Sequence, residues 1–240
     1  MDQVVDTAAS DARALVEAGF PALMVENFGD VPFYPDVVPP ETVSAMTLAM
    51  AAVTDVAGAG VPLGVNVLRN DASAALAIAA TTGASLIRVN IFTGTMYTDQ
   101  GPIVGRAAEV VRKRDAIASG VEIWADVLVK HATAPPGLDP AQAAEDTVVR
   151  GLADAVIVSG TGTGTEPDLE EARAIKGGIP EGTRVVVGSG ATVSNLERLL
   201  DVADTVIVGS SIKVGGDAER RPDPERAATF VAKAAERGML

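Results

Sequence analysis

The chain has 240 residues, of which 48% are hydrophobic and 21% are charged, so it is expected to fold rather than to stay disordered. Its formal net charge of −13 argues against nucleic acid as a partner, because the phosphate backbone would be repelled. Such an acidic protein is typical of a halophile with a high-salt cytoplasm, and it fits a GC-rich genome equally well.

Cysteine and histidine usage narrows the chemistry further. The chain contains no cysteine, which excludes disulfides, thiolate metal sites and a cysteine nucleophile. The single histidine, His131, excludes a cluster of several histidines around a metal within one chain. No window approaches 18 continuous apolar residues, and the N-terminus does not resemble a signal peptide. We therefore expect a cytoplasmic protein with no integral membrane segment.

Apolar runs, often β-branched, alternate along the chain with longer helical patterns, and a helix comes first. The predicted helices are Val4–Ala18, Glu41–Ala57, Asp71–Thr82, Val104–Ala118, Pro140–Leu152, Asp168–Lys176, Ser194–Ala203 and Pro224–Arg237. The predicted strands are Ala22–Asn27, Leu63–Leu68, Leu86–Phe92, Glu122–Val129, Ala155–Ser159, Arg184–Gly188 and Thr205–Gly209. Asp71 and Ser194 can cap the helices that follow them, and Pro140 and Pro224 suit first helical turns.

Strict alternation predicts a parallel sheet with helical crossovers. Eight helices and seven strands, with a helix first, indicate an α/β fold of the (β/α)₈ TIM-barrel type whose first strand is missing from this chain. We expect one such domain over residues 1–240. A doubly wound open sheet is the alternative, although no G-x-G-x-x-G follows the first strand.

Two glycine-rich turns at the ends of the last two strands predict a phosphate site. Gly188, Ser189 and Gly190 end one strand, and Gly209, Ser210 and Ser211 end the next. In many (β/α)₈ barrels these two loops and a helix N-terminus hold a phosphate through backbone N–H groups. Ser159 and Thr161, in the loop after the preceding strand, are predicted to join them. Ordinary turns between strand and helix are the alternative.

Two carboxylates are candidate catalytic groups. Glu26 and Asp126 lie at the ends of apolar strands, where partial burial can raise the pKa of a carboxyl group toward neutrality. The alternative is a salt bridge with Arg69, Arg88 or Lys130 inside the barrel mouth.

Lys130 and His131 follow the fourth strand and are also candidate catalytic residues. A lysine there can pair with a phosphate, polarise a carbonyl group or, with a lowered pKa, form a Schiff base. The histidine can shuttle protons. Because neighbours on a strand face opposite sides, we expect only one of the two to face the site. A solvated lysine and a histidine packed on a helix are the alternatives.

The remaining polar residues at the strand ends are predicted to bind the substrate. Buried polar side chains need partners, and a substrate can supply them. This set consists of Asn66, Arg69, Asn70, Asp71, Arg88, Asn90, Asp99 and Gln100. No cofactor is evident; the carboxylates suit Mg²⁺, but no ligand spacing specifies it.

Several of these stretches together resemble the BtpA/SgcQ family. They are Val25-Glu-Asn-Phe-Gly-Asp-Val-Pro-Phe33, Pro39-Pro-Glu-Thr-Val43, Gly64-Val-Asn-Val-Leu-Arg-Asn-Asp71, Ile87-Arg-Val-Asn90, Tyr97-Thr-Asp-Gln-Gly101, Ala125-Asp-Val127 with Lys130-His131, and Val187-Gly-Ser-Gly190. The resemblance runs over nearly the whole chain in one order. It implies a TIM barrel akin to the ribulose-phosphate-binding barrels, and the family name comes from a membrane-associated factor in photosystem I biogenesis.

The chain departs from the resemblance at its start. Members usually begin with a strand and a loop like V-H-L-x-P-L-P-G, whereas this chain begins at the following helix. We expect either a shortened start or a barrel edge filled otherwise. Because an unpaired edge invites association, we also expect a homo-oligomer.

Two functions follow. The first is an enzyme that uses acid/base chemistry on a phosphorylated small molecule, such as a sugar phosphate or nucleotide-like compound, by isomerase, lyase or glycosidic-bond chemistry. The second is a non-enzymatic assembly or stability factor.

Overall fold

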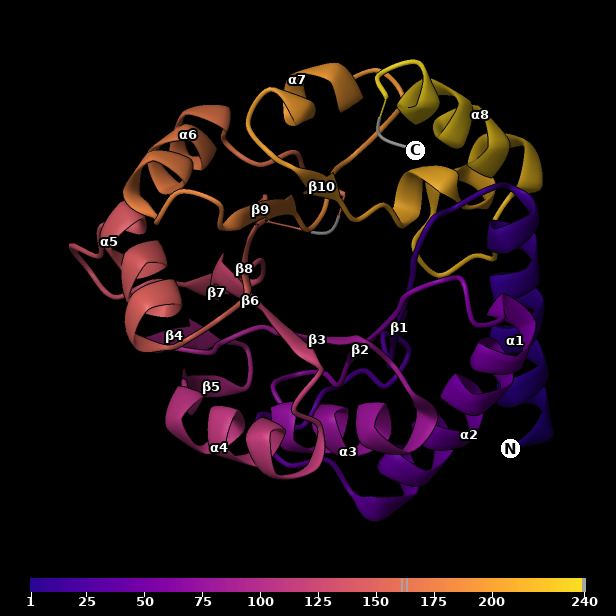
Figure 1. Cartoon of the computed structure of the whole chain (residues 1–240), viewed down its shortest axis with the longest axis horizontal. Helices are drawn as coiled ribbons and strands as arrows, with labels where there is room; N and C mark the ends of the chain where they lie inside the picture. Colours follow the sequence, from indigo (N-terminus) through magenta and orange to yellow (C-terminus); the bar gives the residue numbers. More distant parts are fainter. Residues whose placement is uncertain (161, 163, 239–240) are drawn as a thin grey trace.

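Seven parallel strands curl into an incomplete barrel (Figure 1). The computed structural model describes residues 1–160, 162 and 164–238. Each strand lies within one of the predicted runs, and every neighbouring pair is parallel. In order across the sheet the strands are β1 (Leu23–Glu26), β2 (Leu63–Asn66), β3 (Leu86–Val89), β6 (Glu122–Leu128), β8 (Ala155–Val158), β9 (Arg184–Val187) and β10 (Thr205–Val206).

Helices form an outer ring around this sheet (Figure 1). All eight predicted helices are present, with differences at their ends. They are α1 (Asp2–Glu17), α2 (Pro40–Ala57), α3 (Ala72–Thr82), α4 (Ala107–Ile117), α5 (Pro140–Glu145), α6 (Leu169–Gly178), α7 (Leu196–Leu200) and α8 (Pro224–Ala235). A π-helical turn, Asp146–Arg150, continues α5, and short 3-10 turns cover Ser210–Ile212 and Val214–Gly216.

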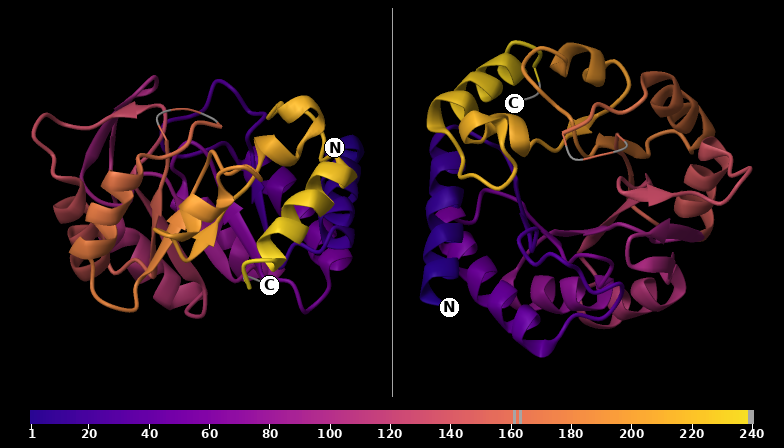
Figure 2. Two further views of the ribbon diagram at one scale, coloured as in Figure 1. Left: turned by 90° about the horizontal axis from the view of Figure 1, so that it is seen from above. Right: turned by 180° about the vertical axis from the view of Figure 1, so that it is seen from behind.

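The sheet has two free edges, but the helical ring closes. Among the described residues β1 and β10 are not paired with each other, so the gap lies where the missing first strand was predicted. Outside this gap α8 lies beside α1 (Figure 2). Phe20 stacks on Phe230 with 6.2 Å between ring centroids, and Arg221 Nε lies 2.6 Å from Asp11 Oδ1. The two terminal helices therefore hold the ring together where the strands do not.

The interior of the barrel is layered because side chains two residues apart on a strand face the same side. Leu86, Trp124, Ile157 and Val186 form an apolar floor, against which Met24 packs. Larger apolar clusters fill the space between the sheet and the helices. The inward-facing residues two positions further along β1, β3 and β6 are charged, so a polar layer lies directly above the apolar floor.

A second, antiparallel sheet was not predicted. Its strands are β5 (Gly101–Val104), β4 (Thr95–Thr98) and β7 (Ala132–Thr133), in that order. The prediction that a helix begins at Val104 is wrong, because Val104 pairs with Thr95 in this sheet and α4 begins at Ala107. Met96 and Ile103 are buried while Tyr97 and Val104 are exposed, which is the alternation of a half-buried hairpin.

One predicted helix cap is present and another is not. Asp71 precedes α3 and accepts hydrogen bonds from the backbone N–H of Ala74 at 2.8 Å and of Val38 at 2.9 Å. Ser194 does not cap, because α7 begins at Leu196, one residue later than a Ser194 cap requires. Asp71 therefore joins the β1–α2 loop to the start of α3.

We predict that Asp71→Ala lowers the free energy of unfolding by about 2–3 kcal/mol, because two backbone donors lose their acceptor and the site is buried. The matched control is Asp168→Ala, which removes an exposed cap of α6 and should cost about 1 kcal/mol. Urea denaturation measures both. Equal losses would contradict a joining role for Asp71.

Candidate functional site

A buried ion pair forms the centre of the polar layer. Arg88 Nε donates to Asp126 Oδ2 at 2.8 Å, and Arg88 Nη2 donates to Oδ1 at 2.8 Å. Burial alone would lower the pKa of Arg88, but the charge and hydrogen bonds of Asp126, with a smaller effect from Glu26, raise it above its ordinary value. The bidentate pair ties β3 to β6, as the salt-bridge alternative for Asp126 predicted.

Glu26 lies beside this pair at the end of β1. Its Oε1 atom accepts from Asn66 Nδ2 at 3.0 Å and from Arg88 Nη1 at 3.4 Å. Its side chain is 24% exposed, and its Oε2 atom accepts no hydrogen bond from the described residues. Of the two predicted catalytic carboxylates, Glu26 therefore keeps a free oxygen, whereas both oxygens of Asp126 are bound.

Asp126 receives further donors from two neighbouring elements. Ser159 Oγ, after β8, donates to Asp126 Oδ1 at 3.2 Å, and Asn90 Nδ2 donates to Oδ2 at 3.4 Å. Ser159 was predicted to bind phosphate, but its hydroxyl is engaged here by the carboxylate. Asp126 thus holds four side-chain hydrogen bonds from three residues.

Three buried polar atoms in this region have no hydrogen-bond partner among the described residues. They are Arg69 Nε, Asn90 Oδ1 and Ser189 Oγ. Arg69 is 3% exposed and Asn90 is 2% exposed, so neither atom is compensated by bulk water. Unpaired buried polar groups are costly, and in native proteins they commonly mark a place where a ligand or water binds.

Lys130 lies in the loop that follows β6. Burial lowers the pKa of its amine, the charge of Arg88 lowers it further, and the carboxylates of Glu26 and Asp126 act in the opposite direction. Its ammonium group makes no hydrogen bond or ion pair with any described residue, and its carbonyl oxygen accepts from Arg69 Nη2 at 2.6 Å. Lys130 is therefore held at the cluster by its backbone while its amine stays available.

His131 lies at the rim and is exposed. Burial lowers the pKa of its imidazole, and the charges of Lys130 and Arg69 add to this effect. We expected only one of Lys130 and His131 to face the site, by alternation along a strand, but β6 ends at Leu128 and both residues feel the charges of the cluster.

Four of the predicted substrate-binding residues occupy other positions. Asn70 clamps the next loop, since its side chain accepts from Ile91 N at 2.8 Å and donates to Ile91 O at 2.9 Å. Asp71 caps α3, as the structural alternative predicted. Asp99 and Gln100 form the turn of the β4–β5 hairpin, where Gln100 Nε2 donates to Asp99 Oδ2.

The glycine-rich turn after β9 packs closely against its neighbours, and Gly188 lies against the cluster. A side chain at Gly188 would place its Cβ 2.7 Å from Ser159 Oγ and 3.0 Å from Arg88 Nη2. Gly190 has φ +78°, and a Cβ there would lie 2.2 Å from the carbonyl oxygen of Thr165. Glycine is therefore required at both positions by close approach. Thr161, predicted to bind phosphate, lies outside the described residues.

The two glycine-rich turns contain free backbone donors. The N–H groups of Ser189, Gly190, Gly209 and Ser210 donate no hydrogen bond to any described residue. Ser211 Oγ donates to Ala191 O at 2.6 Å, which joins the loop after β10 to the loop after β9. A short 3-10 turn, Ser210–Ile212, follows the turn after β10, and α8 begins at Pro224, as predicted.

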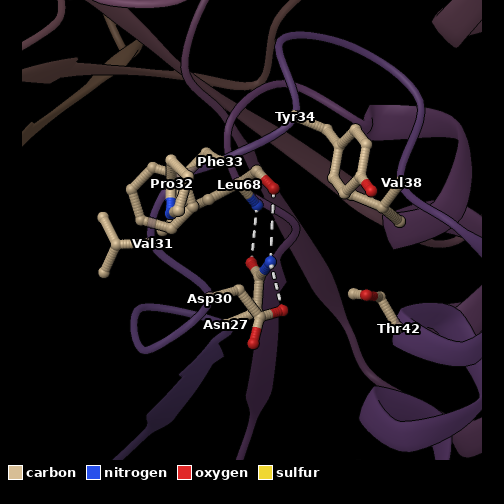
Figure 3. Close-up of a pocket in the computed structure, with 9 residues that line it drawn as sticks. All are labelled: Asn27, Asp30, Val31, Pro32, Phe33, Tyr34, Val38, Thr42 and Leu68. Atoms are coloured by element: carbon tan, nitrogen blue, oxygen red, sulfur yellow. Dashed lines mark hydrogen bonds between the residues drawn. The ribbon is translucent and has the colours of Figure 1, made fainter.

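A pocket adjoins the cluster on the outer side of the β1–α2 loop (Figure 3). Asn27, which follows Glu26, clamps Leu68 by accepting from its N–H at 2.7 Å and donating to its carbonyl at 3.2 Å. Most of the residues that line it have apolar side chains, and they include Val31, Phe33 and Tyr34, none of which was predicted to belong to a site. The exposed apolar side chains within Val31–Val37 are the signal that could have found this pocket.

Neither a metal cluster nor a membrane span is found within the described part of the chain. There, no three His, Asp or Glu side chains gather in a way that could hold a metal ion. No helix of that part is both long enough and apolar enough to cross a bilayer.

We predict that Asp126→Ala lowers the free energy of unfolding by about 3–5 kcal/mol, since it leaves the buried Arg88 guanidinium with only the 3.4 Å contact to Glu26. The double variant Arg88→Met/Asp126→Leu should lose clearly less, because neither charge of the buried pair remains. Urea denaturation gives both values. A single variant no less stable than the double one would show that the ion pair does not hold β3 to β6.

The relatives of this chain match it over most of their own length. It is 45% identical over 233 residues to the photosystem I biogenesis protein BtpA of Synechocystis, covering 97% of this chain and 80% of that protein. It is 45% identical over 235 residues to an uncharacterized protein of Thermococcus kodakarensis, covering 98% and 87% of the two chains. It is 30% identical over 234 residues to the sgc region protein SgcQ of Escherichia coli, covering 97% and 85%.

Solved structures with the same fold include several barrels. The native KDPGal structure aligns with a TM-score of 0.63 at 19% identity, covering 98% of this chain and 91% of that one. Phosphoribosyl anthranilate isomerase from Thermus thermophilus aligns with a TM-score of 0.60 at 13% identity, covering 95% and 94%. These confirm the TIM-barrel type of fold. The BtpA family profile matches residues 1–236, and the chain belongs to the BtpA family.

Proposed function

We propose that this chain is an enzyme that acts on a phosphorylated small molecule, a sugar phosphate or nucleotide-like compound, at the carboxyl ends of its strands. The observation that carries the proposal is the set of free donors in the turns after β9 and β10. Four backbone N–H groups there, at Ser189, Gly190, Gly209 and Ser210, donate to no described residue. Such turns bind phosphate in many barrels of this type.

The charge of the neighbouring cluster supports an anionic ligand. Arg69, Arg88 and Lys130 lie within range of the charges of Glu26 and Asp126, and Asp99 adds a third carboxylate that acts on Arg69. This group brings three basic side chains together in a chain whose net charge is −13. A phosphate bound beside it would gain attraction from a partly buried cation, where solvent screens little.

The residues then divide by role. The turns hold the phosphate, and Asn90 and Arg69 use their unpaired atoms to orient the rest of the substrate. Glu26, with its free oxygen, is the acid or base. Asp126 keeps Arg88 and Asn90 in place rather than exchanging protons, since all of its acceptor oxygens are engaged. The names of the solved barrels, among them thiamine phosphate pyrophosphorylase from Pyrococcus furiosus, are precedent at the level of fold alone.

We predict that ribose 5-phosphate, at about 100 times its dissociation constant, raises the melting temperature by roughly 5–10 °C, because a ligand that binds only the folded state stabilises it by about 2.7 kcal/mol. Gly209→Asp should abolish the shift, because it places a carboxylate beside the free donors in open space. Thermal-shift assays over a panel of sugar phosphates and nucleotides measure this.

The control is Gly120→Asp, which adds the same charge at an exposed glycine with open space around it. Gly120 precedes β6 at the opposite end of the sheet, so the ligand-induced shift should be unchanged. If no phosphorylated compound shifts the wild-type protein, or if both variants respond alike, the phosphate proposal is wrong.

A second candidate function is an assembly factor, on the precedent of the name carried by the Synechocystis relative. The observation that favours it is the exposed apolar β1–α2 loop, where Val31 is 67% exposed, Tyr34 57% and Val37 69%. We predict that Tyr34→Asp/Val37→Asp abolishes co-purification of a defined host partner, whereas Gly209→Asp leaves it intact. The reverse result would favour the enzyme.

A further inference from the structure

We propose that Lys130 is a nucleophile that forms an imine with the aldehyde or ketone group of a phosphorylated substrate. This inference rests on the proposed function for the phosphate, which the turns after β9 and β10 would hold. It adds a carbonyl group as the second feature of the substrate, and it gives Lys130 a covalent role.

The first observation concerns which cation binds the carboxylates of the polar layer. Two carboxylates lie close enough to Lys130 for their charges to act on it, yet both contact Arg88, at 2.8 Å from Asp126 and 3.4 Å from Glu26, and neither accepts a hydrogen bond from Lys130. A lysine near carboxylates normally pairs with one. Here the bidentate geometry of the guanidinium satisfies Asp126 more fully than an ammonium could, and Lys130 is left without a partner among the described residues.

The second observation concerns the burial of the Lys130 amine and the charges around it. Burial disfavours a positive charge on Lys130 most strongly, and Arg88 on β3 and Arg69 after β2 add to this effect. Glu26 on β1 and Asp126 on β6 favour the charge. The net result is a pKa below that of an ordinary lysine, and the neutral amine is the form that attacks a carbonyl. Arg69 Nη2 fixes the backbone of Lys130 at 2.6 Å, so the nucleophile starts from an anchored position.

The third observation is that two buried polar atoms of the same layer have no hydrogen-bond partner among the described residues. Arg69 Nε is a buried donor without an acceptor, and Asn90 Oδ1 is a buried acceptor without a donor among the described residues. A carbonyl oxygen and a hydroxyl group would satisfy these two atoms respectively. A hydroxy-aldehyde or hydroxy-ketone phosphate presents both groups together with the phosphate. It is therefore the class of substrate that matches the unpaired donor and the unpaired acceptor.

The chemistry balances without an oxidant or a cofactor. The neutral amine of Lys130 forms a nitrogen–carbon bond to the carbonyl carbon as the carbon–oxygen π bond breaks, and the carboxyl group of Glu26 gives its proton to the oxygen. The nitrogen then releases one proton to the Glu26 carboxylate, which leaves a neutral carbinolamine. Glu26 passes this proton to the hydroxyl group, the carbon–oxygen bond breaks to release water, and the protonated imine remains beside the Glu26 carboxylate.

Reductive trapping tests the proposal on the full chain. Glyceraldehyde 3-phosphate or glyceraldehyde is added at pH 7 with sodium cyanoborohydride, and the modified lysine is located by peptide mass mapping. We expect one adduct, on Lys130, formed roughly tenfold faster than on any other lysine for each unit by which its pKa lies lower. The phosphorylated aldehyde should react at lower concentration than glyceraldehyde.

Two variants serve as controls. Lys130→Arg keeps the positive charge and removes the nucleophile, so it should bind the phosphorylated aldehyde in a thermal-shift assay and form no adduct. Lys176→Arg removes an exposed lysine of α6 that pairs with Asp204 at 3.3 Å. Asp204 precedes β10, at the end of the sheet opposite the mouth, so this change should leave the adduct unchanged.

The outcomes separate the two proposals. Thermal stabilisation by glyceraldehyde 3-phosphate without an adduct on Lys130 overturns the imine and leaves phosphate binding intact. A selective adduct with both aldehydes at equal concentrations supports the imine and counts against the phosphate site. Adducts spread evenly over the surface lysines, or no adduct and no stabilisation, overturn the imine.

Discussion

The bidentate pair of Arg88 and Asp126 is the interaction on which the rest of the site depends. It is buried, it joins β3 to β6, and it also contacts Glu26 at the end of β1, Asn90 directly after β3 and Ser159 directly after β8. A buried pair of this kind adds little net stability compared with apolar residues, but removing one partner is expensive. Its value here is positional, because it sets which of the surrounding polar groups remain unpaired.

That allocation assigns different roles to residues that look alike in the sequence. Asp126 is saturated and Glu26 is not, although both are carboxylates at strand ends. Within the described part of the chain, Arg88 is saturated, Arg69 has one free nitrogen, and Lys130 has a free amine. The hydrogen bonds of the Arg88–Asp126 pair thus determine which donors and acceptors at the mouth remain available for chemistry.

The fold was largely predictable from the sequence, because buried parallel strands are short apolar runs separated by helices, and every such run became a strand. The count of seven strands in the parallel sheet of the described residues also followed from the sequence. The β4–β5–β7 sheet could not be predicted, since β7 has two residues and pairs with a strand more than 30 positions away. The alternating pattern at Met96 and Ile103 was the one local signal, and polar residues around it concealed it.

The candidate site was predictable in membership and not in pairing. Placement at strand ends brought Glu26, Asn66, Arg88 and Asp126 together, as the topology of a parallel barrel requires. Which cation binds which carboxylate depends on distances of a few tenths of an ångström between strands, and no spacing in the sequence encodes them. Asn70 shows the same limit, because its clamp on Ile91 depends on the path of a neighbouring loop.

The gap between β1 and β10 divides the mouth into two halves. Glu26 stands on one side of it and the turn at Gly209 on the other, with no strand of the described residues between them to set their spacing. Across the gap, that spacing is maintained by the contact of α1 with α8 and by an ion pair between Asp11 of α1 and Arg221, which precedes α8 and lies 210 positions away in the chain. Closing this contact has an entropic cost, because the loop between its two residues is nearly the whole chain. The contact between α1 and α8 therefore holds the two halves of the mouth at a fixed distance. A change that weakens this contact would alter the distance between Glu26 and the turn at Gly209 without changing either of them.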